Sequence, residues 1–329
     1  MKVTFKDVGQ GDSIILEWKD GEKEKVGIID CNKKSKNNPV RDHIREAGYK
    51  EIEFVILSHP HSDHYSGMNE LLSFFEENKI VVNKFGHTLF ILGQDFYRYL
   101  NWAEINSAAM KELQELITNV GNLRQLGVIK KIEFISENWT QELSVDVLLK
   151  CLSPSQDEAE RYMSIVKMEP EKNKKAASAS ANHLSTMFSL VRGDNYYLLT
   201  ADTEATSLER LLNEMQHKEF EQKALQVGQL PHHGSSKNSY DPFWERLKKH
   251  DERHAVASAG YNMKYQHPNL TVLEKFHNNG YIINCTNIVH GGQEYLNYLK
   301  SLKATSDRLD TISELIDNYQ GGEKVFTLV

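Results

Sequence analysis

A cluster of histidine and aspartate residues that directly follows a short apolar segment constrains this chain more than any other feature. Residues 53–58 form an apolar run that fits a buried β-strand, and the chain continues as His59-Pro60-His61-Ser62-Asp63-His64. The two histidines at positions 59 and 61 can leave the same side of an extended segment. Asp63 and His64 begin a helix and can turn toward a second point. One segment thus offers two ligand pairs, which suits two metal ions about 3.5–4 Å apart.

Imidazole and carboxylate ligands without a thiolate favour zinc, with manganese or iron as alternatives. Two divalent ions need more ligands than one loop supplies, and further candidates follow other predicted strands. Asp202 ends the apolar run 196–199, where its alternative role is to cap the following helix. His232 and His233 follow another short strand. His183 and His267 are single histidines and therefore weaker candidates.

Composition limits the class of protein. The chain has 329 residues, 40% hydrophobic and 26% charged, as in ordinary globular proteins. Its net charge of −7 argues against a surface that binds nucleic acid everywhere, and three cysteines exclude a disulfide scaffold. No apolar run resembles a secretory signal or a membrane span. We therefore expect a cytoplasmic protein that does not bind a membrane.

The distribution of strand patterns predicts one domain over residues 1–329. Strands and turns alternate in the first 88 residues and return after residue 180. Residues 88–180 are predicted to be a strand-poor, mainly helical insertion, in which the polar stretch 156–180 suits a loop. Residues 300–329 are predicted to form a helix and then a strand at 324–329.

Several of these segments together resemble the metallo-β-lactamase fold superfamily. The resemblance is greatest to the branch that contains the hydrolase domain of the ComEC/Rec2 competence proteins and the phosphorylcholine esterase of pneumococci. It covers residues 1–88 and 181–290. Six segments match in order: Asp7-Val8-Gly9-Gln10-Gly11-Asp12-Ser13, Ile28-Ile29-Asp30, Ser58 to His64, Leu199-Thr200-Ala201-Asp202, Pro231-His232-His233-Gly234-Ser235, and Ser258-Ala259-Gly260 to His267-Pro268.

The resemblance implies an αββα sandwich with two metals at one edge of its sheets. His59 and His61 would bind one metal, Asp63 and His64 the other, and Asp202 would bridge them. One of His232 and His233 would complete the second site, and His233 is the favoured one. Asn182-His183 occupies the place where many superfamily members carry a third histidine, so His183 is a further candidate ligand. His267 would lie on the substrate side.

The departures from the family pattern are modest. Ala201 and Gln266 stand where the family usually has glycine, and Cys31-Asn32 replaces a pair of glycines. None of these changes removes an expected ligand. The membrane channel of the DNA-uptake proteins has no counterpart in this sequence.

This ligand set predicts hydrolysis by a hydroxide that bridges the metals, because paired metals lower the pKa of water. Asp63 or Asp202 would hold the nucleophile or take its proton. His267 would bind or protonate an oxyanion. The remaining candidates are expected to contact substrate or to orient ligands. They are Asp12, Asp30, Asn182, Ser235, Ser236 and Lys237. For the two serines, turn formation is the alternative role.

We expect a phosphodiesterase, specifically a nuclease, with nucleic acid or a nucleotide as substrate. Lys33, Lys34, Lys36 and Lys237 offer local cations to phosphates, although runs of charge usually form solvated faces. The alternative substrate is a small ester: a phosphocholine ester, a cyclic nucleotide or a lactone. A choline site would need an aromatic cage, for which Tyr97, Tyr99 and Trp102 are candidates. The third alternative is a binding module without catalysis. A protein partner that docks on the insertion is a separate possibility.

Overall fold

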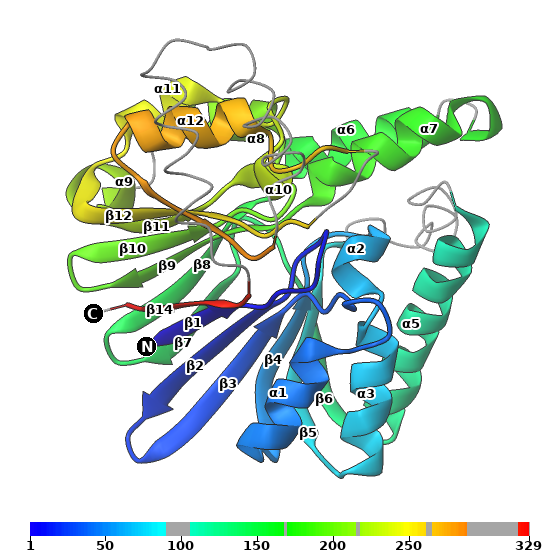
Figure 1. The fold of residues 1–329 in the computed structure, drawn as a ribbon. Coiled ribbons are helices and arrows are strands. Elements are labelled where there is room, and N and C mark those ends of the chain that lie inside the picture. Colours follow the sequence, from blue (N-terminus) through cyan, green and yellow to red (C-terminus); the bar gives the residue numbers. More distant parts are fainter. Residues whose placement is uncertain (90–105, 168–169, 215–217, 261–264, 288–321, 329) are drawn as a thin grey trace, which may run out of the picture.

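The fold is an αββα sandwich, as the sequence predicts. A computed structural model describes residues 1–89, 106–167, 170–214, 218–260, 265–287 and 322–328. Two mixed β-sheets pack against each other, and helices cover their outer faces (Figure 1).

The first sheet is built mainly from the N-terminal part of the chain. Its seven strands lie in the order β14 (Lys324–Thr327), β1 (Lys2–Phe5), β2 (Ile14–Asp20), β3 (Lys23–Ile29), β4 (Glu51–Leu57), β5 (Val81–His87), β6 (Ile129–Phe134). The pairs from β14 to β3 are antiparallel, and those from β3 to β6 are parallel. The outer face packs on three helices, α1 (Pro39–Ala47), α3 (Met68–Glu77) and α5 (Ser107–Gln125).

The second sheet holds the C-terminal part of the sandwich. Its seven strands lie in the order β13 (Ile282–Cys285), β12 (Lys249–Ala257), β11 (Ala224–Gln229), β10 (Asn195–Leu199), β9 (Met187–Arg192), β8 (Val147–Ser153), β7 (Thr140–Ser144). The pairs from β10 to β13 are parallel, and the other pairs are antiparallel. The outer face packs on α8 (Ala205–Glu214), α9 (Lys218–Gln222), α11 (Asp241–Arg246) and α12 (Leu270–Asn278).

The alternation of side chains along each strand divides the core into layers. On β2, Ile14 and Leu16 face the other sheet, whereas Ile15 faces the helices. The layer between the sheets takes Leu149 from β8 and Tyr197 from β10. Because both faces of each sheet are covered, the central strands are apolar on both sides, as parallel strands usually are.

The prediction that residues 88–180 are strand-poor is wrong for 129–153. This segment supplies β6 to the first sheet and β7 and β8 to the second. Its charged side chains misled the interpretation: Lys130 and Lys131 lie exposed on β6, an edge strand, where charge is common. The helix expected before it is α5, with Leu113, Leu116, Ile117 and Val120 buried on one face as predicted.

The polar stretch 156–180 also differs from the prediction of a loop. It contains α6 (Gln156–Lys167) and α7 (Pro170–Ser180), followed by the 3-10 turn η2 (Ala181–Leu184). Ala159, Tyr162 and Val166 are buried at helical spacing, a signal that was present in the sequence. At the C-terminus, β14 lies within the predicted strand 324–329, and the predicted helix falls outside the described residues.

In the described part of the chain, no helix has the length and apolar character needed to cross a membrane.

Candidate metal centre

The ends of parallel strands bring the predicted ligands together. His59 and His61 follow β4, Asp202 follows β10, and His233 follows β11 within the short helical turn α10 (Pro231–Gly234). Asp63 and His64 lie on α2 (Ser62–Tyr65), which begins directly after His61. Because parallel strands end at the same edge of a sheet, the segments that follow β4, β10 and β11 lie at one edge of the sandwich (Figure 1). The side chains of these segments meet there.

The first group of ligand atoms consists of His59, His61 and Asp202. His59 Nε2 lies 3.1 Å from His61 Nδ1 and 3.6 Å from Asp202 Oδ2. These separations match the edges of a coordination sphere with bonds of about 2.0–2.2 Å.

The second group consists of Asp63, His64 and His233. His233 Nε2 lies 3.4 Å from Asp63 Oδ2, and His64 Nε2 lies 3.9 Å from Asp63 Oδ1. The other carboxylate oxygen of Asp202, Oδ1, lies 3.4 Å from His64 Nε2 and 3.3 Å from His233 Nε2. The two oxygens of Asp202 therefore face two separate groups, as a bridging ligand requires.

Unpaired atoms in the second group show that the residues fit a cation. His64 Nε2, His233 Nε2 and Asp202 Oδ1 are all buried without a hydrogen-bond partner. Buried polar atoms without partners are costly, and three of them converge on one point. A divalent ion at that point would satisfy all three.

Hydrogen bonds on the far side of each imidazole assign its tautomer. His61 Nε2–H donates to the Ser178 carbonyl at 2.9 Å, His64 Nδ1–H to Asp30 Oδ2 at 2.7 Å, and His233 Nδ1–H to the Ser258 carbonyl at 2.8 Å. Each of these rings therefore presents the lone pair of its other nitrogen to the site, as a metal ligand must.

His59 follows the same rule through a hydroxyl. Ser58 Oγ donates to Asp30 Oδ2 at 2.6 Å, and so its oxygen is free to accept from His59 Nδ1–H at 3.2 Å. Asp30 also accepts from the Ser58 amide at 2.7 Å. The expected orienting role of Asp30 thus has a direct structural basis. Ser58 belongs to the same network, a role that the sequence interpretation missed although the residue precedes the histidine cluster.

Asp12 supports the second group from the opposite side. Its amide donates to the Asp63 carbonyl at 3.1 Å, and its Oδ2 accepts from Gln229 Nε2 at 2.9 Å. The preceding Gly11 has φ +128°, and a Cβ there would lie 2.2 Å from the Asp63 carbonyl oxygen. Only glycine permits this approach. Gln229 was not among the predicted residues.

Carboxylates dominate the electrostatics of the cluster. Burial alone would lower the pKa of His233, but the negative charges of Asp202, Asp12 and Asp63 raise it to about 9. The carboxylates of Asp202 and Asp30 likewise raise the pKa of His64 well above its usual value, against the effect of burial. Burial lowers the pKa of His59, which lies beside His64. The site therefore favours added positive charge, which divalent cations would supply.

Backbone strain is concentrated at the same edge. Ala201, His232, His233 and Gln266 all have φ between 42° and 58°. Residues with a Cβ rarely adopt this conformation, which costs about 1–3 kcal/mol at each position. Ala201 and Gln266 are two of the positions at which the family resemblance calls for glycine, so the chain keeps the glycine conformation without glycine.

The other predicted residues lie at different depths around the cluster. The ring of His267 lies 5.4 Å from that of His232 and 6.4 Å from that of His233, and burial lowers its pKa to about 4. Ser235 is buried and accepts from the Lys237 amide at 3.3 Å, a bond that supports the turn. Ser236 and Lys237 are exposed on the same loop.

The candidate ligand His183 does not join either group of ligand atoms among the described residues. The 3-10 turn η2 instead brings its neighbour Asn182 to the cluster, where Asn182 Nδ2 lies 3.3 Å from His232 Nδ1. Consecutive side chains of such a turn point in different directions, so both cannot face the site. Burial lowers the pKa of His183, and the charge of Glu204 partly opposes this shift.

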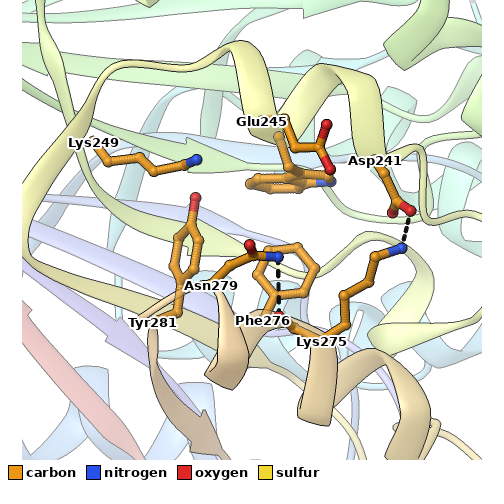
Figure 2. Close-up of a pocket in the computed structure, with 8 residues that line it drawn as sticks. Asp241, Glu245, Lys249, Lys275, Phe276, Asn279 and Tyr281 are labelled. Atoms are coloured by element: carbon orange, nitrogen blue, oxygen red, sulfur yellow. Dashed lines mark hydrogen bonds and ion pairs between the residues drawn. The ribbon is translucent and has the colours of Figure 1, made fainter.

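A separate cleft lies between α11 and α12 and contains none of the predicted site residues. Figure 2 shows its aromatic walls, which include Phe276 and Tyr281, and the ion pair between Lys275 and Asp241. Its volume is about 10 Å³, room for one water molecule. This cleft is too small to hold a substrate of the kind that the histidine cluster would cleave.

Comparisons with known proteins concern the fold. No family model and no curated protein matches the sequence. Among solved structures, YhfI of Bacillus subtilis, a metallo-β-lactamase fold protein, is similar with a TM-score of 0.43 and 10% identity, over 99% of this chain and 98% of YhfI. A diphosphatase of the PhnP family is similar with a TM-score of 0.42 and 11% identity, over 88% of this chain and 96% of that protein.

The diiron β-hydroxylase CmlA of Streptomyces venezuelae is similar with a TM-score of 0.43 and 10% identity, over 88% of this chain. The chain spans 53% of CmlA, about half its length. None of these three proteins is described as a competence protein or a phosphorylcholine esterase. Membership of that branch therefore stays a prediction.

Proposed function

We propose that the chain is a dinuclear metal-dependent hydrolase that cleaves phosphodiester bonds. The observation that carries the proposal is Asp202, whose two oxygens face two groups of imidazole and carboxylate ligand atoms. Two divalent ions held there would lower the pKa of water and neutralise charge on the group under attack. Zinc suits the donor atoms, and manganese and iron are the alternatives.

The protein residues have distinct parts in this proposal. Asp202 is 1% exposed, and its two oxygens connect the two groups of ligand atoms. The side chain of Asp63 is 31% exposed, which makes it the carboxylate of the cluster that water reaches most easily. We assign the acceptance of the nucleophile's proton to Asp63. His267 lies beside the cluster, and we assign it to the binding of substrate.

One lysine near the candidate site, Lys237, favours a phosphodiester substrate. Lys33 and Lys34 form ion pairs with Glu70 and Asp7, which weakens their expected role with phosphates. Lys237 is exposed and forms no ion pair in the part of the chain that the structure describes. Since Lys237 follows the His233 turn by a few residues, it is the lysine best placed for a phosphate. The family resemblance also points to phosphodiester cleavage.

The test combines metal analysis with three substrates. Purified protein, loaded with Zn²⁺ or Mn²⁺, is incubated with linear DNA, with RNA and with bis-p-nitrophenyl phosphate. We expect about two metal ions per chain and turnover that His61→Ala and Asp202→Asn abolish. His250→Ala is the control, since His250 lies on β12 and contacts Glu252 rather than the cluster.

Each other outcome contradicts a definite part of the proposal. Protein that binds no metal would be a binding module and not this enzyme. Metal-loaded protein that cleaves a lactone, a cyclic nucleotide or a phosphocholine ester, but no phosphodiester of the three tested, would overturn the substrate class and leave the hydrolase. The candidate choline cage of Tyr97, Tyr99 and Trp102 lies outside the described residues.

A further inference from the structure

One histidine of the site is oriented differently from the others. His59, His61, His64 and His233 each present a lone pair to the cluster, because a hydrogen-bond acceptor lies behind the opposite ring nitrogen. Behind His232 Nδ1 lies the side-chain nitrogen of Asn182, at 3.3 Å. An amide nitrogen only donates, so His232 Nδ1 is the acceptor.

The orientation of the Asn182 amide is set by a third residue. Asn182 Nδ2 also donates to Glu204 Oε1 at 3.1 Å. Rotating the amide by half a turn would place its oxygen against the Glu204 carboxylate, so that two acceptors would face each other without a hydrogen. Glu204 therefore keeps the amide nitrogen toward His232. A neutral imidazole that accepts at Nδ1 carries its proton on Nε2.

The Nε2 atom of His232 points toward the metal centre. It lies 3.4 Å from Asp202 Oδ2, the oxygen that also faces His59. The side chain of His232 is 27% exposed, whereas those of His59, His64 and His233 are at most 1% exposed. Of these four imidazoles, His232 is the most exposed. His61 is also partly exposed, but its hydrogen bond to the Ser178 carbonyl directs a lone pair to the site.

We propose that His232 is a hydrogen-bond donor to an oxygen of the substrate and not a metal ligand, and that Asn182 and Glu204 are the positioning residues that keep its Nε2–H pointing into the site. This inference rests on the proposed hydrolase function. It leaves the first group with three protein ligands, His59, His61 and Asp202, and thus with an open position, as catalytic metal sites usually have. A donor placed in advance stabilises negative charge that develops on a substrate oxygen.

Metal content distinguishes a donor from a ligand without any assay of activity. His232→Ala and His233→Ala are each loaded with Zn²⁺, dialysed and analysed for zinc, and far-ultraviolet circular dichroism checks that both are folded. We expect His232→Ala to keep the zinc content of the wild type and His233→Ala to lose about one ion. A folded His232→Ala that loses one ion overturns the inference while the proposed function stands. Wild-type protein without zinc would instead overturn the proposed function.

A second variant reverses the tautomer and leaves His232 in place. In Asn182→Asp combined with Glu204→Gln, the new carboxylate accepts from His232 Nδ1–H and the new amide donates to that carboxylate. The lone pair of Nε2 then faces the site. We expect kcat on bis-p-nitrophenyl phosphate to fall about 10²–10³-fold, as when a preorganised donor is lost, with KM and zinc content unchanged. Unchanged kcat in this double variant would overturn the inference, because a ligand histidine tolerates or prefers this tautomer.

Glu209→Gln is the matched control, since Glu209 is exposed on the same helix, α8. We expect it to change neither kcat nor zinc content. Glu204→Gln alone should give an intermediate loss of kcat, because a glutamine amide holds Asn182 in either orientation.

Discussion

Ala201 has a left-handed backbone that glycine adopts more readily. Its φ is 42°, its amide donates to Gln229 Oε1, and its carbonyl accepts from the His232 amide. These bonds hold the residue in a conformation that a Cβ disfavours by about 1–2 kcal/mol. Ala201→Gly should therefore raise the free energy of unfolding by up to about 1 kcal/mol, since part of the relief is offset by the greater freedom of glycine in the unfolded chain. Urea denaturation measures the change.

Ala159→Gly is the control, because the same substitution at this position should lower the free energy of unfolding. Ala159 is buried within α6, so that glycine there removes packing and adds backbone freedom in a helix. We expect the free energy of unfolding to fall by about 1 kcal/mol or more. If Ala201→Gly and Ala159→Gly lower the free energy of unfolding equally, the idea that Ala201 carries backbone strain is wrong.

Asp30 orients two of the candidate ligand histidines at once, His64 directly and His59 through Ser58. It accepts hydrogen bonds from Ser58 N, Ser58 Oγ and His64 Nδ1, all within 2.7 Å. In Asp30→Asn, the amide group can accept at only one of its two positions, so His64 or Ser58 loses its partner. We expect the affinity for the metal of the second group to fall about 10–100-fold, as for other outer partners of ligands. Competition with a chromogenic chelator measures this, and equal affinity in wild type and variant would contradict it.

At the scale of the element, local patterns predict some parts of the chain well and others poorly. The histidine loop after β4 and Asp202 after β10 were predicted as site residues because polar side chains follow the end of an apolar strand, and the structure brings them together. The edge strands β6 and β7 were missed because one side of an edge strand meets solvent and carries charge. The orientation of His232 was also beyond prediction, since it depends on Asn182 and Glu204, which only the folded chain brings beside it.

The hairpin of β7 and β8 should behave as part of the core and not as a removable insertion. Leu149 on β8 is fully buried between the sheets, whereas Val145 in the turn of the same hairpin is fully exposed. We expect Leu149→Ala to lower the free energy of unfolding by about 2–5 kcal/mol and Val145→Ala to change it by less than about 0.5 kcal/mol. Chemical denaturation compares the two. Equal, small effects would mean that this hairpin contributes nothing to the sandwich.

At the scale of the whole molecule, the candidate metal centre lies where the two sheets meet. His59 and His64 follow a strand of the first sheet, whereas Asp202 and His233 follow strands of the second. The chain carries a net charge of −7, and Asp12, Asp30, Asp63 and Asp202 bring four carboxylates to one buried place. Two divalent ions would add four positive charges there. These charges would cancel those of the four carboxylates, so that an anionic substrate would no longer be repelled from the site.

Metal removal should therefore lower the stability of the whole sandwich and not only of one loop. An ion present at 100 times its dissociation constant stabilises the fold by about 2.7 kcal/mol, and two ions by about twice that. For a chain of this size, we expect dialysis against a chelator to lower Tm by about 5–10 °C in a single cooperative transition. Asp202→Asn separates this effect from a general action of the chelator: it removes the bridging charge, so its Tm should respond little to chelation. A wild-type Tm that is the same with and without chelator would show that no ion joins the two sheets.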